Sequence, residues 1–232
     1  MANRDQLYHA IRAASRIIEQ PGVLIIGSQS ILATWAEYEL PDIATQSMEL
    51  DVMPLSDDDM RSVATRIEGA AGEWSDFHFT HGFYLDGVDR NTATLPIDFM
   101  DRLVSVMSER TDGYIGYCLD PHDLAVAKLI ANRQKDREFV AAIIEAELVD
   151  PNLIEEYLWR THAPSHVIES AVDFLEEKLF RWRTFGISAK TPWSSLANDT
   201  ATSFSDVLKD AKQLESILMT DEMPGSEDIQ GN

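Results

Sequence analysis

Glu49 and Asp51 stand two residues apart in the run 48–53, Met-Glu-Leu-Asp-Val-Met. The run alternates apolar and acidic residues, which is typical of a strand, and residues two apart in a strand point to the same face. Two carboxylates on one face repel each other unless a cation lies between them. Mg²⁺ prefers such oxygen ligands, together with substrate phosphates. The pair therefore predicts a magnesium site formed by Glu49 and Asp51.

A glycine and a serine precede this pair by some twenty residues. The continuous apolar run 23–26, Val-Leu-Ile-Ile, predicts a buried strand that ends at a tight turn made by Gly27 and Ser28. We expect Gly27 to let a ligand approach the backbone. Because a short helical pattern follows, the Ser28 hydroxyl and the N–H groups of the turn are suited to holding phosphates.

The order strand, Gly-Ser, helix and acidic-x-Asp strand resembles the signature of the polymerase-β-type nucleotidyltransferase superfamily. More narrowly, three segments resemble a bacterial family of uncharacterised nucleotidyltransferase-like proteins that is related to the nucleotidyltransferase toxins of toxin–antitoxin systems. These segments are Ile-Gly-Ser-Gln-Ser-Ile-Leu at 26–32, Leu-Pro-Asp-Ile-Ala-Thr at 40–45 and Cys-Leu-Asp-Pro-His-Asp-Leu-Ala-Val-Ala-Lys-Leu at 118–129. The resemblance covers roughly residues 5–150.

The resemblance implies Mg²⁺-dependent transfer of a nucleotidyl group from an NTP to a hydroxyl, with tRNA as one acceptor and a cognate antitoxin as one partner. Glu49 and Asp51 would be catalytic and bind the metal, although the first acid is Glu where the superfamily usually has Asp. A third carboxylate is common in the superfamily. Asp86, Asp89 and Asp98 are its candidates, and the sequence leaves the choice among them open.

A local basic segment lies in the third resembling region. Residues 128–137 carry four positive charges against one negative charge, in a chain whose formal charge is −21. Lysine or arginine beside a metal site can hold a triphosphate and offset charge on departing pyrophosphate. The resemblance assigns this role first to Lys128, and after it to Arg133, Lys135 and Asp136. Of these, Arg133 would bind nucleotide and Asp136 is counted among the catalytic residues, while Arg137 is better explained as part of a solvated face.

Composition restricts the class of protein. The chain has 232 residues, 44% of them hydrophobic, and no run approaches the roughly 18 apolar residues that span a bilayer. The single cysteine, Cys118, excludes an internal disulfide and suits a reducing cytoplasm. The strongly acidic charge argues against an extended basic groove for nucleic acid and favours a basic partner.

Hydrophobic periodicity predicts an α/β (α+β) fold, a small mixed sheet flanked by helices with a helical C-terminal half. We expect a nucleotidyltransferase-like core over 1–115, a helical region over 116–186, a linker and last helix over 187–219, and a disordered acidic tail over 220–232. The expected helices are 4–19, a short one after Ser28, one capped by Ser56, and others opening at Asp120, Asp150 and Pro164. Further strands are expected at 77–79, 82–85 and 93–96.

Two histidine pairs have spacings that could suit a metal site. His78 and His81 would face opposite sides of the strand expected there, which argues against a zinc site. His162 and His166 have helical spacing, but Pro164 lies between them.

The sequence leaves two alternatives to a freely active transferase open. One is a catalytically silent relative that binds a nucleotide or a protein partner, and the other is a toxin held inactive by its antitoxin.

Overall fold

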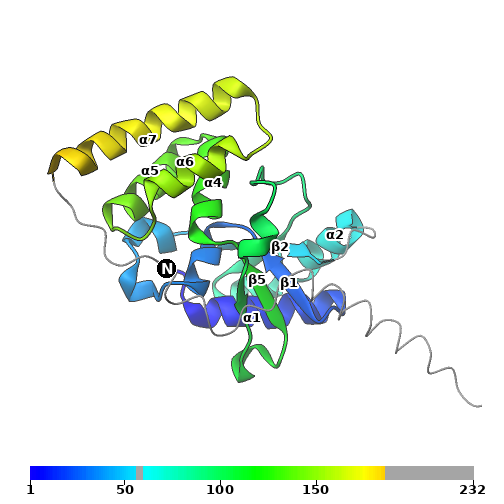
Figure 1. Ribbon diagram of the computed structural model, residues 1–232. Helices are drawn as coiled ribbons and strands as arrows, with labels where there is room; N and C mark the ends of the chain where they lie inside the picture. The colour runs from blue at the N-terminus through cyan, green and yellow to red at the C-terminus, as the bar shows by residue number, and fades with distance from the viewer. Residues whose placement is uncertain (56–59, 186–232) are drawn as a thin grey trace, which may run out of the picture. The chain divides into compact units, whose positions relative to one another are not determined.

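The computed structural model describes residues 1–55 and 60–185, all of which belong to one compact unit, Met1–Pro192. Its core is a five-stranded mixed sheet in the order β3-β2-β1-β5-β4 (Figure 1). The strands are β1 (Gly22–Ile25), β2 (Glu49–Pro54), β3 (Tyr84–Gly87), β4 (Val104–Val106) and β5 (Ile115–Cys118). The predicted fold class is therefore confirmed.

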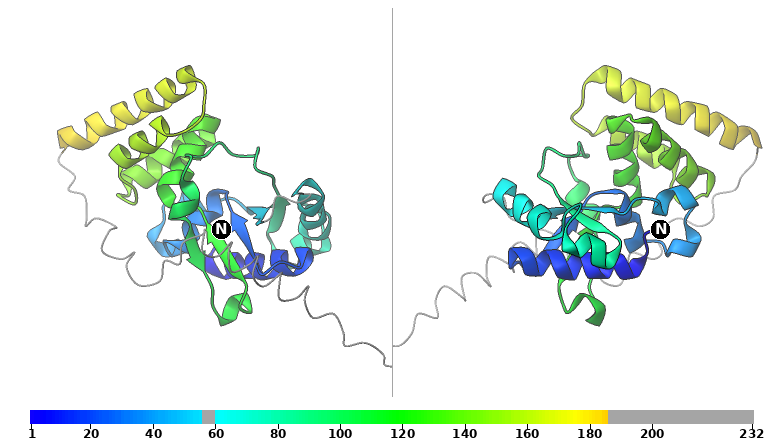
Figure 2. Two further views of the ribbon diagram at one scale, coloured as in Figure 1. Left: turned by 45° about the vertical axis from the view of Figure 1, so that its right-hand side comes forward. Right: turned by 180° about the vertical axis from the view of Figure 1, so that it is seen from behind.

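Helices lie on both sides of the sheet, with α1 and α2 packed against its strands. Figure 2 shows α1 on one side of it and the group α4 to α7 on the other. The α-helices are α1 (Arg4–Ile18), α2 (Met60–Ala71), α3 (Asp76–His81), α4 (Pro121–Ala131), α5 (Gln134–Glu145), α6 (Pro151–Trp159) and α7 (Ser165–Phe185). Shorter 3-10 turns are η1 (Ser28–Ala33), η2 (Glu37–Glu39), η3 (Asp42–Thr45), η4 (Phe99–Arg102) and η5 (Glu109–Thr111).

The first helix forms where the sequence predicts it, for local reasons. Asn3 and Gln6 make a reciprocal capping box at its start, and Glu19 ends it in the left-handed conformation. Its apolar stripe, including Leu7 and Ile11, is fully buried. The helix lies so close to the sheet that a Cβ at Gly116 of β5 would come within 2.3 Å of Ile11 Cδ1.

Strand pairing sorts the side chains of the sheet onto its two faces. In β2 and β3, Leu50 pairs with Leu85, and Val52 pairs with Gly87, where an added Cβ would meet Ala64 of α2. This set therefore faces α2. The alternate residues of both strands point to the opposite face, toward the helical group that contains α4.

Several local predictions were wrong. Residues 77–79 form part of helix α3 rather than a strand, because the Ser75 hydroxyl caps the helix and Gly82 ends it with a positive φ of 72°. Residues 93–96 are not a strand, although Pro96 forms an isolated bridge with Thr161. The helix expected after Ser28 is the 3-10 turn η1, and β4 and β5 were not predicted.

Some predictions fall on residues outside the described part of the chain. They are the helix start at 56–59, the stop at Gly186, the linker and helix over 187–219 and the acidic tail over 220–232. Within the described part, no helix combines the length and the apolar character that crossing a membrane requires.

Candidate active site

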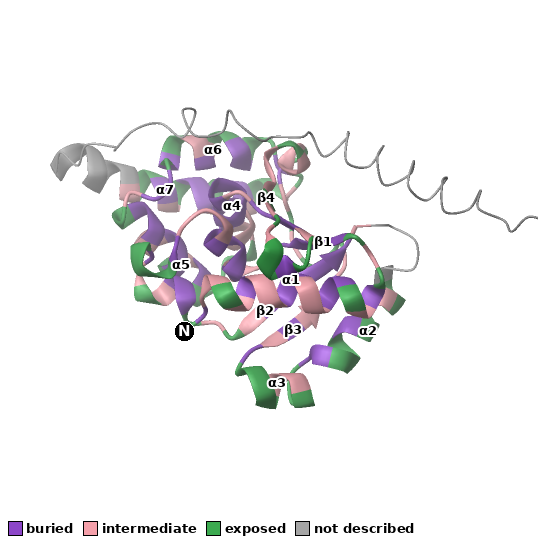
Figure 3. Cartoon of the chain, turned by 90° about the horizontal axis from the view of Figure 1, so that it is seen from below, coloured by how far each residue is buried: buried purple, intermediate pink, exposed green. Residues whose placement is uncertain are grey.

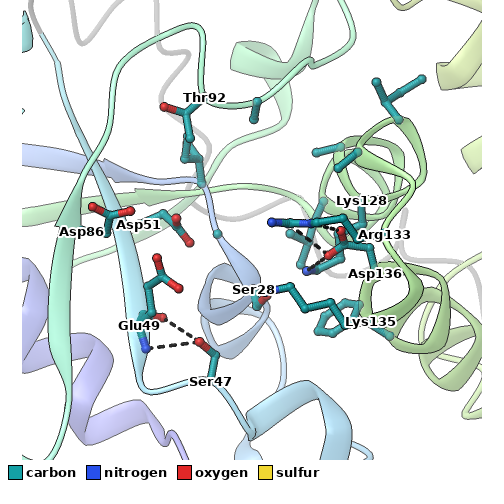
Figure 4. Close-up of a pocket in the computed structure, with 18 of the residues that line it drawn as sticks. Ser28, Ser47, Glu49, Asp51, Asp86, Thr92, Lys128, Arg133, Lys135 and Asp136 are labelled. Carbon is teal, nitrogen blue, oxygen red and sulfur yellow. Dashed lines mark hydrogen bonds and ion pairs between the residues drawn. The ribbon is translucent and has the colours of Figure 1, made fainter. Parts of the chain in front are cut away.

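The carboxylates meet on one face of the sheet. Strands β2 and β3 are parallel, with Glu49 paired with Tyr84 and Asp51 paired with Asp86. Glu49, Asp51 and Asp86 consequently point to the same side, and one carboxylate oxygen of each lies within 4.8 Å of the others (Figure 4). In residues 1–55 and 60–185 they form the one cluster of three or more acidic, histidine or cysteine side chains with such spacing. Of the three candidates for a third acid, the structure brings Asp86 to the pair, and Asp86 lies within β3.

The other two candidates have different surroundings. Asp89 Oδ1 accepts a hydrogen bond of 2.8 Å from the Asn91 N–H within a turn. Asp98 forms ion pairs with Arg102, at 3.0 Å, and with Arg160. Asp89 and Asp98 are therefore not part of the cluster.

Gly27 makes room for one of these carboxylates. A Cβ at Gly27 would lie 1.6 Å from Asp51 Oδ2, so no larger residue fits while Asp51 keeps its position. From the sequence we expected a ligand to approach the backbone at Gly27, and the structure places the Asp51 side chain there. The Ile26 N–H also donates to the Asp51 carbonyl at 3.1 Å, which fixes β1 and β2 together beside the glycine.

Proximity changes the acidity of the cluster. Burial and the charge of Asp86 raise the pKa of Asp51, against the opposing effect of Lys128. Burial, together with a hydrogen bond to Glu49 and its charge, raises the pKa of Asp86 to about 6. Both shifts show that the assembled carboxylates resist full ionisation, and a divalent cation among them would relieve this resistance.

A positively charged wall faces the carboxylates. Lys128 Nζ donates to Asp136 Oδ1 at 3.1 Å, and Arg133 Nε donates to Asp136 Oδ2 at 2.5 Å. The Asp136 side chain is almost fully buried, whereas that of Arg133 is 62% exposed. Asp136 therefore anchors two cations, and together the three groups carry one net positive charge.

This wall depends on a break between two helices. Asn132, with a φ of 55°, ends α4, and Arg133 is the N-cap of α5. The turn brings Asp136 of α5 back onto Lys128 of α4, and Lys128 Nζ also lies 4.4 Å from the centre of the Phe139 ring. Burial lowers the pKa of Lys128, which Asp136 opposes. Burial acts to raise the pKa of Asp136. The hydrogen bond from Arg133 and the charge of Lys128 outweigh this effect, so the pKa of Asp136 is lowered.

A cavity of about 640 Å³ lies between the two walls. This volume is within the range of about 300–1,000 Å³ common for small-molecule sites. Figure 4 shows Ser28 between the carboxylates and the cations. The cavity brings together every site residue expected from the sequence, which are Gly27, Ser28, Glu49, Asp51, Lys128, Arg133 and Asp136.

Other residues of the cavity were missed by sequence reasoning. Ser47 Oγ accepts a hydrogen bond of 3.1 Å from the Glu49 N–H and so fixes the start of β2. Thr92 and Thr94 line the cavity from the segment between β3 and β4. Lys135 lines it as well, and the sequence already offered it as a further candidate for holding phosphate. No short motif marks the two threonines, because their position depends on how that segment crosses the cavity.

A mixed sheet that presents clustered carboxylates beside a Gly-Ser turn, with lysine and arginine opposite, fits the nucleotidyltransferase signature that the sequence resembles. The comparison with protein families agrees. Residues 5–188 match the model of the DUF6036 family, described as nucleotidyltransferase of unknown function, and the chain belongs to this family. No curated protein and no solved structure matches the chain.

Proposed function

We propose that the protein is a Mg²⁺-dependent nucleotidyltransferase that moves a nucleotidyl group from an NTP to a hydroxyl acceptor. The observation that carries this proposal is the opposition, across one cavity, of the Glu49–Asp51–Asp86 cluster and the Lys128–Arg133 pair. A nucleoside triphosphate needs both walls, because its phosphates carry several negative charges and are usually bound with a divalent cation.

The donor set fits Mg²⁺, because three carboxylates supply hard oxygen ligands and leave room for phosphate oxygens and water. Glu49, Asp51 and Asp86 would hold the ion. When bound, Mg²⁺ supplies charge neutralisation for the phosphates and favours ionisation of the attacking hydroxyl.

The residues of this chain act on both sides of the transferred group. The acceptor oxygen forms a bond to the α-phosphorus, the bond from that phosphorus to the bridging oxygen breaks, and pyrophosphate leaves with the electron pair. A carboxylate of the cluster receives the acceptor proton. Ser28 and the neighbouring backbone N–H groups hold phosphate oxygens, while Lys128 and Arg133 bind the β- and γ-phosphates and stabilise the leaving pyrophosphate.

Asp136 acts through its partners rather than on the substrate. Its carboxylate is engaged by Lys128 and Arg133, and its side chain is 1% exposed. We therefore assign it as a positioning residue that keeps both cations directed toward the cavity, which refines the catalytic role expected from the sequence.

For the acceptor and partner, the resemblance to toxin relatives supplies the first compounds to test. We infer that the hydroxyl belongs to a macromolecule in the cytoplasm, with tRNA as the first acceptor to assay, and that a cognate antitoxin is the first protein partner to seek.

The test is calorimetric titration of each NTP into the full chain, with Mg²⁺ and with EDTA. The variants are Glu49→Gln and Asp86→Asn, and the matched control is Asp89→Asn, which changes an acid outside the cluster. We expect Mg²⁺-dependent binding of at least one NTP, lost in the first two variants and kept in the control.

The outcomes separate the alternatives. NTP binding that does not depend on metal or on the carboxylates would contradict the proposed chemistry. Mg²⁺-dependent binding without turnover in the presence of tRNA and protein acceptors would favour a silent relative. Equal loss in Asp89→Asn would overturn the assignment of Asp86 as the third carboxylate.

A further inference from the structure

An aromatic patch lies outside the cavity, on the segment after α2, on α3 and at the first residue of β3. The residues Trp74 and Phe79 are 71% and 70% exposed, and the centres of their rings lie 6.3 Å apart. His78 stacks nearly parallel to Phe79 and contacts Tyr84, with ring centres at 5.9 and 5.0 Å. Large apolar side chains exposed singly need no explanation, but two adjacent exposed aromatic rings indicate a binding surface. We call Trp74, His78, Phe79 and Tyr84 the aromatic patch.

The local backbone holds the ring of Trp74 outward. Trp74 has a φ of 66°, a conformation that is rare for a bulky residue. Its N–H donates to His78 Nδ1 at 3.1 Å, and the His78 N–H donates to Ser75 Oγ at 3.1 Å. The indole is thus presented from a fixed turn, where α3 lies at the margin of the described unit beside β3 (Figure 3).

The charges beside the patch select the kind of partner. Trp74 lines a shallow hollow with Thr65, Glu68, Gly69, Glu73 and Ser75, a set with two carboxylates and no lysine or arginine. The chain as a whole carries a formal charge of −21. Exposed rings can stack on nucleobases, but carboxylates around them repel the phosphates that dominate nucleic-acid affinity. The same carboxylates attract a cationic side chain.

We propose that the aromatic patch, with Glu68 and Glu73, docks an arginine- or lysine-rich segment of a partner protein. A guanidinium over the Trp74 ring gains a cation–π interaction, and the two carboxylates supply the opposite charge. Phe79 extends the apolar surface for the aliphatic part of the next basic side chain. This docking does not require the chain to transfer nucleotides.

The probe is a fluorescein-labelled peptide of alternating arginine and glycine, titrated with the full chain and followed by fluorescence anisotropy. Its neutral counterpart carries citrulline in place of arginine. Trp74→Ala should weaken binding about 2- to 30-fold, the range expected for a cation–π contact. Glu68→Gln with Glu73→Gln should weaken it further, and the citrulline peptide should not bind.

Matched controls separate this surface from general attraction to an acidic protein. Trp159→Ala removes a tryptophan that is 58% exposed on α6, and Glu176→Gln with Glu177→Gln removes two exposed charges on α7. Both controls should bind the peptide as the wild type does. If they lose as much affinity as the patch variants, binding is non-specific and the proposal is wrong.

Two further measurements complete the test. Trp74→Gly removes the ring and suits the positive φ, so it should melt above Trp74→Ala while binding the peptide as weakly. A single-stranded RNA probe distinguishes the nucleic-acid alternative, because the paired glutamine substitutions would strengthen RNA binding and weaken peptide binding. RNA binding that exceeds peptide binding and is lost in Trp74→Ala would overturn the proposal.

Discussion

The backbone of Gly27 lies so close to Asp51 that the position of a Cβ at residue 27 is 1.6 Å from Asp51 Oδ2. Gly27→Ala should therefore displace the carboxylate and reduce Mg²⁺-dependent NTP binding at least tenfold, with measurable loss of stability. Gly69→Ala is the control, because nothing lies within 4 Å of its Cβ and alanine favours the helix. Calorimetric titration of NTP with Mg²⁺ into both variants measures the binding. Normal NTP binding by Gly27→Ala would show that Asp51 need not hold its position.

Asp51 itself should matter to activity more than to stability. Burial and the Asp86 charge raise the pKa of Asp51, so the metal-free fold gains little from this negative charge. Asp51→Asn should abolish transfer while the melting temperature stays unchanged or rises by about 2–4 °C per kcal/mol of repulsion relieved. Differential scanning calorimetry without metal, next to an assay of pyrophosphate release, measures both. Full activity in this variant would remove Asp51 from the site.

The anchoring role of Asp136 can be separated from catalysis by a double substitution. Asp136→Asn leaves Lys128 buried without its partner and should lower both the melting temperature and the NTP affinity. Adding Lys128→Met removes the unpaired charge and should restore much of the melting temperature but not the affinity. Should the double variant regain NTP binding, the cations would have no part in holding phosphate.

A second buried ion pair joins the segment before β4 to the helical region. Arg102 donates to Asp123 at 2.9 and 2.6 Å and lies 4.0 Å above the Tyr157 ring, while Asp123 is fully buried. Arg102→Met should destabilise the fold by about 3–5 kcal/mol, because the buried Asp123 carboxyl is left without its partner. Asp123→Leu added to it should recover part of the loss. Chemical denaturation of Arg102→Met, Asp123→Leu and the double variant gives the coupling energy between the two residues.

His9 should contribute to the loss of stability of the fold at acidic pH. Its ring centre lies 4.3 Å from that of His81, and burial, with the charges of His81 and Arg12, lowers the pKa of His9 to about 4. Because the unfolded chain binds this proton more readily, the contribution is complete above about pH 6.5 and is lost as the pH falls toward 4. His9→Phe should reduce the change of the melting temperature with pH between about 6.5 and 4. His166→Gln, on α7, is the control, and an unchanged profile for His9→Phe would contradict the assignment.

The sequence predicts well what depends on short-range pattern. The apolar run 23–26 and the alternation around Glu49 correctly indicate strands, since a buried strand and a half-buried strand each have their own periodicity. Asp120 and Pro121 correctly mark the start of α4, where Asp120 accepts a hydrogen bond from the His122 N–H at 2.8 Å. The candidate cation Lys128 lies on the same helix, α4.

Other features could not be chosen from sequence because they depend on pairing between distant segments. Asp86 joins the cluster only through the parallel register of β2 and β3, which local pattern does not determine. The error at Phe77 has a different cause. The alternation Phe-His-Phe imitates a strand, whereas Ser75 and Gly82 carried the helix signals that would have corrected it.

The break at Asn132 gives the positive wall an all-or-none character. Lys128 and Asp136 belong to different helices, so their ion pair exists only when the corner between α4 and α5 is closed. Closing that corner also buries Lys128 against Phe139. The positive charge of this wall therefore takes its position only in the folded chain, and an isolated peptide spanning 121–131 would carry Lys128 without Asp136 to orient it.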